Sequence, residues 1–178
     1  LDENLQLMAE DALKEGLLEY DKRQGWRGRI ASIDSSNIDN NWLKNFKSLN
    51  LKTNNIMPYG VVLSFNNENI TIGFLDGSKG KLDFEESSWV IDDNLDGLSL
   101  NSNFYKNNIL KLGDVYVFKE SKKYTSNNRV FKLNQIPKVN GGIVALDAFT
   151  GKVLALVGGY NFYNNKFNRV TQAQRHAG

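Results

Sequence analysis

The 178-residue sequence contains no cysteine and only one histidine, His176. Without cysteine the chain can form neither disulfide bonds nor thiolate zinc sites. A lone histidine does not make a convincing metal site, so we expect no metal and no cofactor. We interpret His176 as a surface or packing residue, with a role as general base or ligand as the alternative.

Long apolar runs and a strong net charge are also missing. No stretch approaches the roughly 18 consecutive apolar residues that cross a bilayer, and no signal peptide opens the chain. The formal net charge is only +2, whereas nucleic-acid-binding modules usually show a clear basic excess. With 40% apolar and 24% charged residues, the composition is that of a globular protein with enough hydrophobic residues for a core.

The first part of the chain has the pattern of helices. Apolar residues recur near helical spacing over residues 5–20, and Asp2 is a plausible N-cap. Gly25 and Gly28 end this first helix. A second, shorter helix is expected in residues 37–49, where apolar side chains share one face.

From Gly60 onward, short alternating runs separated by turn residues indicate β-strands. The strand-like segments cover residues 60–65, 69–74, the later part of 75–84, 87–91, 113–120 and 129–137. Asp76-Gly77 marks a tight turn between two of them. Five or six strands within about 80 residues, with one long irregular connection over 92–108, favour a small barrel or sandwich. We prefer an OB-like antiparallel barrel.

Two strongly apolar strands follow, at residues 143–146 and 153–157, joined through the sequence DAFTG. Strands that are apolar on both faces normally lie inside a large sheet, and a lone hairpin is marginal in water. We therefore expect this hairpin to begin another domain and to fray or self-associate by itself. The predicted fold class is mainly β with flanking helices (α+β): a linker helix, an OB-like barrel and a C-terminal hairpin.

One loop has the first half of a calcium-binding pattern. Asp92, Asn94 and Asp96 alternate before Gly97, as in an EF-hand loop. The twelfth position of that loop requires a bidentate glutamate, but here it is Asn103, and we expect no flanking helices. A polar surface loop is the better interpretation.

Two further motifs also favour structural interpretations. The sequence GSKG at residues 77–80 has the spacing of the backbone-clamping loop of a KH module. That loop joins helices, whereas this segment lies between strand-like runs, so we predict a β-turn. Glu85 and Glu86 are adjacent, and on a strand their side chains would face opposite ways, which argues against a catalytic dyad.

The aromatic residues raise the possibility of stacking on single-stranded nucleic acid. The candidates are Phe65, Phe74, Phe84, Trp89, Tyr116, Phe118 and Phe131. At strand spacing, however, aromatic side chains are usually part of the core. No serine, histidine and aspartate set can be assigned from spacing either, so the residues alone reveal no complete active site.

Three segments resemble class A penicillin-binding proteins, which carry a glycosyltransferase and a transpeptidase domain. Residues 1–28 resemble the stretch that follows the glycosyltransferase domain. Residues 135–162, QIPKVNGGIVALDAFTGKVLALVGGYNF, resemble the first strands of the transpeptidase domain. Residues 167–178, FNRVTQAQRHAG, resemble the run before the nucleophile motif, which is serine, two variable residues and lysine.

This resemblance implies that the chain is a segment of a longer parent protein. It would consist of a linker helix after the glycosyltransferase domain (1–25), an OB-like inserted domain (26–137) and the start of the transpeptidase domain (138–178). The catalytic serine is expected immediately after Gly178. No catalytic residue of the family falls on a position of this chain, so we expect the segment itself to be inactive.

The resemblance also implies a function. The parent would polymerise and cross-link peptidoglycan at the periplasmic side of the bacterial inner membrane, anchored by an N-terminal transmembrane helix. Activation of the serine by the lysine would permit attack on a D-alanyl-D-alanine amide or a β-lactam. The segment would position the catalytic domains and dock peptidoglycan or envelope regulatory proteins through the barrel edge and residues 92–108, without binding nucleic acid. The alternatives are an independent OB-type single-strand nucleic-acid binder and a shortened but active transpeptidase.

Overall fold

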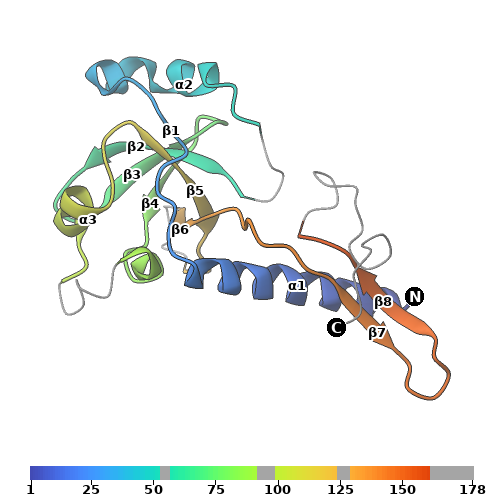
Figure 1. The fold of residues 1–178 in the computed structure, drawn as a ribbon. Helices are drawn as coiled ribbons and strands as arrows, with labels where there is room; N and C mark the ends of the chain where they lie inside the picture. Colours follow the sequence, from blue (N-terminus) through green and yellow to red (C-terminus); the bar gives the residue numbers. More distant parts are fainter. Residues whose placement is uncertain (53–56, 92–98, 124–128, 161–178) are drawn as a thin grey trace. The chain divides into compact units, whose positions relative to one another are not determined.

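A computed structural model describes residues 1–52, 57–91, 99–123 and 129–160. The chain divides into two compact units. One unit, Trp26–Ile136, contains the barrel, and the other combines Leu1–Gly25 with the described residues from Pro137 onward (Figure 1).

Five strands form a closed barrel in Trp26–Ile136. They are β2 (Tyr59–Phe65), β3 (Ile70–Phe74), β4 (Lys79–Leu82), β6 (Val130–Asn134) and β5 (Asp114–Glu120), in this order around the barrel. Strand β5 pairs with both β6 and β2 and so closes the sheet, while β4 and β6 run parallel. The two-residue strand β1 (Ala31–Ser32) pairs with β5. The predicted OB-like barrel is confirmed.

The inside of the barrel is a core of aromatic and branched side chains. Phe118 and Phe131 have no more than 1% of their surface exposed, and Tyr105 is fully buried. Tyr105 comes from the short helix α3 (Ser102–Asn108), which Asn101 caps by accepting the Phe104 N–H at 3.0 Å. The Tyr105 hydroxyl donates to the Phe84 carbonyl at 2.7 Å. Burial raises the pKa of Tyr105, so its hydroxyl stays a donor.

The structure corrects two predictions for the connection between β4 and β5. Residues 87–91, predicted as a strand, contain the 3-10 helix η2 (Ser88–Val90), and the predicted irregular connection contains α3. In this segment side chains, not backbone groups, bind the neighbouring strand β6. The Ser87 hydroxyl accepts the Leu133 N–H, and the Trp89 indole donates to the Leu133 carbonyl, both at 3.0 Å. These contacts span more than forty residues, so no local pattern reveals them.

A second core lies on the outside of the barrel under α2 (Ile38–Ser48), which the 3-10 helix η1 (Ser35–Asn37) precedes. Figure 1 shows α2 beside the barrel strands, and Trp42 and Phe46 of α2 pack with Val61 and Leu63 of β2. Gly73 of β3 makes this approach possible, because a Cβ there would lie 2.6 Å from Trp42 Cζ3. The predicted second helix is confirmed.

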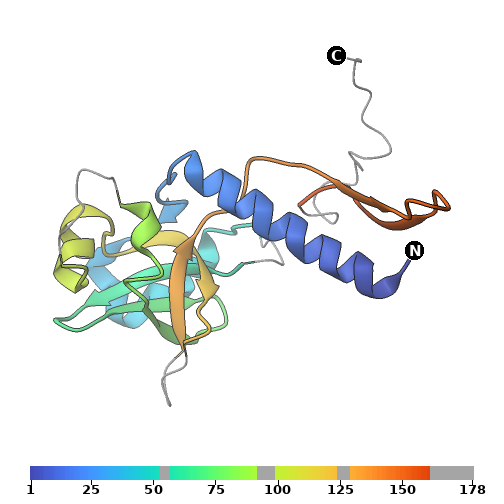
Figure 2. The same cartoon turned by 90° about the horizontal axis from the view of Figure 1, so that it is seen from below.

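The other unit contains α1 (Glu3–Arg23) beside a hairpin of β7 (Ile143–Leu146) and β8 (Val153–Val157), as Figure 2 shows. The predicted first helix and the hairpin are confirmed. The N-terminal end of α1 covers the outer edge of β8. The Gln6 side chain donates to the Leu156 carbonyl (3.1 Å) and accepts the Leu156 N–H (2.9 Å), and the Asp2 N–H donates to the Leu154 carbonyl (2.8 Å). These bonds satisfy backbone groups that a strand edge otherwise leaves unpaired.

Gly73→Ala is expected to destabilise the barrel by about 1–3 kcal/mol, because the added methyl group displaces Trp42 from β3. Urea unfolding of the 178-residue chain measures this cost. Gly16→Ala in α1 is the matched control: nothing lies within 4 Å of a Cβ there, so the variant should gain about 0.5–1 kcal/mol of helix stability. Equal stability of both variants would contradict the tight contact.

Gln6→Met keeps the length of the side chain but removes both bonds to Leu156. Amide hydrogen exchange at Leu156 should become about fivefold faster, as expected for the loss of a bond worth about 1 kcal/mol. Gln24→Met, at an exposed position just after α1, should leave this rate unchanged. An unaltered rate in Gln6→Met would show that Gln6 does not protect the β8 edge.

Candidate functional site

A groove of about 570 Å³ opens on the surface of the barrel where β2 ends. We call it the β2-end groove. Its lining comes from η1, α2, β2, α3 and the segment that follows α3, and comprises Ser35, Ile38, Asp39, Leu63, Ser64, Phe65, Lys106, Leu110, Lys111 and Leu112. The floor is apolar, and charged side chains stand at the rim. Such a combination is typical of surfaces that bind ligands or partner segments.

Backbone hydrogen bonds hold the walls of the β2-end groove in place. The Gly113 N–H donates to the Val62 carbonyl, and the Ile33 N–H donates to the Gly113 carbonyl, both at 2.9 Å. Gly113 has φ +82°, and a Cβ there would lie 2.7 Å from the Ile33 carbonyl oxygen, so this position requires glycine. The Leu110 N–H donates to Tyr105 O at 2.7 Å. The groove is therefore built on a rigid frame.

The charges at the rim of the groove are of both signs but are unevenly distributed. Lys106 and Lys111 lie on the α3 side, and Asp39 lies in the first turn of α2. The Lys106 ammonium is 5.9 Å from the centre of the Phe65 ring, which is cation–π distance. Within the described part of the chain, neither lysine forms an ion pair with a carboxylate.

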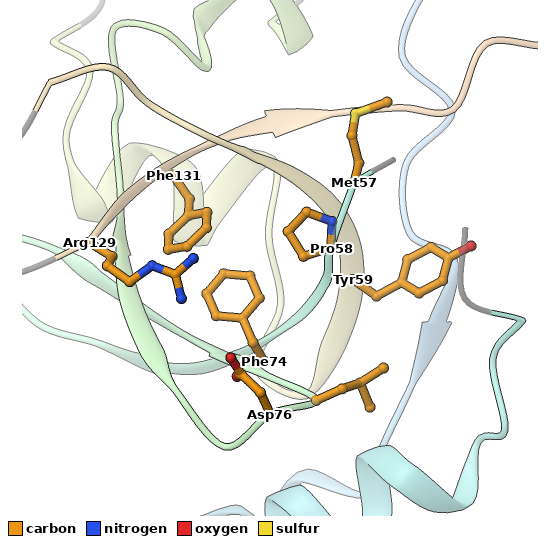
Figure 3. A pocket seen from close by; sticks show the side chains of 8 residues that line it. Met57, Pro58, Tyr59, Phe74, Asp76, Arg129 and Phe131 are labelled. Carbon is orange, nitrogen blue, oxygen red and sulfur yellow. The ribbon is translucent and has the colours of Figure 1, made fainter. Parts of the chain in front are cut away.

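A second concavity, of about 250 Å³, lies between β3, β6 and the start of β2 (Figure 3). We call it the Arg129 hollow. Phe74 and Phe131 form its apolar wall with ring centres 4.2 Å apart, and the Arg129 guanidinium lies 5.0 Å from the Phe131 ring centre. Arg129 also binds both carboxylate oxygens of Glu120, at 3.0 and 3.3 Å.

The polar groups of the Arg129 hollow are bonded to one another. Asp76 accepts the Ser78 N–H at 2.9 Å and the Ser78 hydroxyl at 2.6 Å, and these bonds lower the pKa of Asp76. Arg129 donates to the same hydroxyl at 3.4 Å. This network fastens the β3–β4 turn to the β5–β6 hairpin, which is a structural role.

Several residues considered from the sequence lie outside the described part of the chain. They are Asp92, Asn94, Asp96, Gly97, His176 and Gly178. Asn103, the twelfth position of the calcium pattern, lies in α3. In the ranges that the structure describes, no group of three or more histidine, cysteine or carboxylate side chains could hold a metal ion.

The first half of the GSKG segment, Gly77 and Ser78, lies in the turn between β3 and β4, whereas Lys79 and Gly80 begin β4. Gly77 has φ +86°, which favours glycine, and its N–H donates to the Phe74 carbonyl at 2.9 Å. The Phe74 N–H in turn donates to the Ser78 carbonyl at 2.9 Å. The interpretation as a β-turn is therefore confirmed for Gly77 and Ser78 but wrong for Lys79 and Gly80, which pair in the sheet.

The aromatic residues belong to the barrel core, as the strand spacing indicated. Phe74, Tyr116, Phe118 and Phe131 are no more than 4% exposed. The other three candidates, Phe65, Phe84 and Trp89, are partly buried and pack against the same core. Four of the seven rings are thus buried in the barrel core, and the other three are partly exposed.

Glu85 and Glu86 lie in a turn after β4. They have different cationic partners: Lys123 Nζ is 2.8 Å from Glu85 Oε2, and Lys132 Nζ is 3.0 Å from Glu86 Oε2. Lys123 also lies 3.4 Å from Asp83. The two glutamates therefore take part in ion pairs that join this turn to the β5–β6 hairpin.

The closed five-stranded barrel with one helix before β5 defines an OB-like domain. A family model described as the penicillin-binding protein OB-like domain matches residues 26–139. The chain belongs to this family, as a class A, type 1A-like member. The resemblance seen in the sequence is thereby confirmed.

The relatives and the solved structure agree with this assignment. Over its full length the chain is 39% identical to penicillin-binding protein 1A of Rickettsia conorii and spans 20% of that protein. Over 98% of its length it is 29% identical to penicillin-binding protein 1A of Escherichia coli, again spanning 20% of the relative. The crystal structure of penicillin-binding protein 1A from Haemophilus influenzae matches 94% of the chain and 22% of its own, with a TM-score of 0.63 and 26% identity. The chain thus spans about a fifth of the length of its curated relatives.

No helix among the described residues is long and apolar enough to cross a membrane.

The Glu86–Lys132 pair makes the stability of the barrel depend on pH. The Lys132 ammonium, 3.0 Å from Glu86 Oε2, lowers the pKa of Glu86 below its ordinary value of 4.5. The charged form therefore stabilises the folded state above pH 4.5, and this contribution is lost as the pH falls through the lowered pKa. Glu86→Gln should lower the free energy of unfolding by about 1 kcal/mol at pH 7.

Urea unfolding of Glu86→Gln and of the unsubstituted chain, at pH 7 and at several acidic pH values, tests this expectation. The difference should shrink as the pH is lowered below 4.5. Glu85→Gln is the matched control, because the Glu85 side chain is 83% exposed and should contribute less at every pH. A difference for Glu86→Gln that is independent of pH would contradict the pKa shift.

Proposed function

We propose that this chain is the non-catalytic middle part of a bifunctional penicillin-binding protein, whose parent polymerises glycan strands and cross-links their peptides. The observation that carries the proposal is the similarity of the whole chain to penicillin-binding protein 1A, which it spans over only a fifth of the length. On this proposal residues 1–25 follow the glycosyltransferase domain, and residues 138–178 begin the transpeptidase domain. Both activities belong to the parent.

The catalytic chemistry requires groups that this chain does not supply. In the family, a lysine activates a serine that attacks the D-alanyl-D-alanine amide, and an oxyanion hole stabilises the tetrahedral intermediate. On this proposal that serine follows directly after the position of Gly178. The parent acts at the periplasmic side of the inner membrane, where its substrate is polymerised and cross-linked.

We assign two roles to the OB-like unit: it holds the two catalytic domains at a fixed spacing, and it docks peptidoglycan or regulatory proteins of the envelope. The first role is supported by the place of residues 26–136 in the sequence, between two segments that belong to one compact unit. The second is supported by the β2-end groove, whose frame is rigid and whose rim carries accessible lysines. Binding surfaces often lie on loops held by such a scaffold.

Covalent labelling by a fluorescent penicillin tests whether the acylation activity belongs to the parent and not to the 178-residue chain. The full parent should form a covalent adduct, and replacing the serine that follows Gly178 by alanine should abolish it. The 178-residue chain should remain unlabelled under the same conditions. A folded parent that does not react would overturn the proposed function. A labelled 178-residue chain would instead show that its catalytic serine lies within these residues.

A further inference from the structure

We propose that the β2-end groove binds an acidic segment of a partner protein that inserts one bulky apolar side chain. This inference rests on the proposed docking role and adds where the partner binds and which chemistry it presents. It depends on three features of the groove: an apolar floor, a rigid frame and an uneven distribution of rim charges.

The floor provides the space and the surface for an apolar anchor. Leu63 and Leu110 are buried beneath the groove, whereas Leu112 at its edge remains 39% exposed. The volume of about 570 Å³ lies within the range of roughly 300–1,000 Å³ that small binding pockets have. A phenylalanine, leucine or tryptophan inserted there would cover Leu112. Anchors of this kind supply most of the affinity at protein interfaces.

The charges at the rim of the groove determine which charge the bound partner segment carries. Lys106 and Lys111 extend from the α3 side, are exposed, and have no carboxylate partner among the described residues. Acidic side chains on either side of the anchor would complement them, which increases the association rate and the specificity. Asp39, on the α2 side, repels acids and so restricts them to the α3 side.

The same charges argue for a polypeptide rather than a phosphate polymer. Affinity for nucleic acid grows with the number of phosphates that lysine and arginine neutralise. The groove offers two lysines and sets a carboxylate opposite them, so its net charge is small. An extended peptide with a few acidic residues and one anchor fits both the charges and the apolar floor.

The frame makes the site suitable for a mutational test. Lys106, Lys111 and Asp39 are exposed, so their substitution removes charge without opening the core. The segment between α3 and β5 is held by the bond of Leu110 to Tyr105 of α3 and by the bond of Gly113 to Val62 of β2. A change in binding can therefore be attributed to the groove once the urea unfolding midpoint of each variant has been shown to match that of the unsubstituted chain.

The probe is a displayed peptide library in which a central leucine, phenylalanine or tryptophan is flanked by aspartate, glutamate, serine and glycine. A second library carries lysine and arginine in place of the acids. Both are selected on the immobilised 178-residue chain, and the enriched sequences are synthesised with a fluorescent label. Their dissociation constants for the chain and its variants are then measured by anisotropy.

We expect enrichment from the acidic library alone. The double variant Lys106→Glu/Lys111→Glu should weaken binding at least about tenfold, and Leu112→Ala about fivefold. Asp39→Asn should strengthen binding about twofold, because it removes a competing negative charge. The matched control is Lys79→Glu/Lys119→Glu, two exposed lysines of β4 and β5 outside the groove, which should change the dissociation constant less than twofold.

Three results would overturn the proposal. They are enrichment of basic peptides only, equal binding by the double variant and its control, or dimerisation of the chain in sedimentation that the groove variants abolish. The last result would identify a second copy as the occupant. The parent with Lys106→Glu/Lys111→Glu should still react with fluorescent penicillin, so loss of peptide binding is separate from a failure of the parent function.

Discussion

The structure depends on a buried carboxylate at the end of the first helix. Asp21 is only 1% exposed, and it accepts the N–H of Lys138 at 3.0 Å. This bond joins the end of α1 to the start of the segment that leads into β7, so the chain leaves and re-enters one unit at a single place. Burial, together with the Asp21 charge, raises the pKa of nearby Tyr160 to about 12. The 111 residues between Gly25 and Pro137 are thereby inserted into a helix–hairpin unit that carries its own hydrogen bonds.

Within the inserted unit, β2 contributes side chains to two hydrophobic cores. Val62 faces the inside of the barrel, while Val61 and Leu63 face outward to α2. A strand that is packed on both faces has little freedom to move, since close-packed side chains resist displacement. The surface available for function therefore lies where β2 ends and the connections to α2 and α3 meet. The Arg129 hollow differs from the β2-end groove in that its charged groups are already bonded to Glu120 and Ser78.

Elements with a strong internal period could be predicted from the sequence, whereas those that depend on distant contacts could not. Helix α2 and the barrel strands carry their apolar residues at regular spacing, so their burial was predictable. For α1 the spacing predicted the helix but not its buried face: Leu5, Met8 and Tyr20 are exposed. The buried residues of α1 are Ala9, Leu13, Leu18 and Asp21. The segment 87–91 resembles a strand locally, but Ser87 and Trp89 bind Leu133 through their side chains. The groove was not predicted because Asp39, Leu63 and Lys106 come from three separate elements. Only the strand order and the glycine at position 113 bring them together.

We propose that the OB-like unit organises the parent but takes no part in its bond-making steps. The most direct test removes residues 26–136 from the parent, joins Gly25 to Pro137 through a short glycine–serine linker, and measures the rate of acylation by penicillin beside the cross-linking of nascent peptidoglycan. We expect acylation within about twofold of the unaltered parent, with a marked loss of cross-linking. A folded deletion variant that is no longer acylated would show that the OB-like unit is needed for the bond-making step. A variant that cross-links as well as the unaltered parent would show that the unit does not organise the parent.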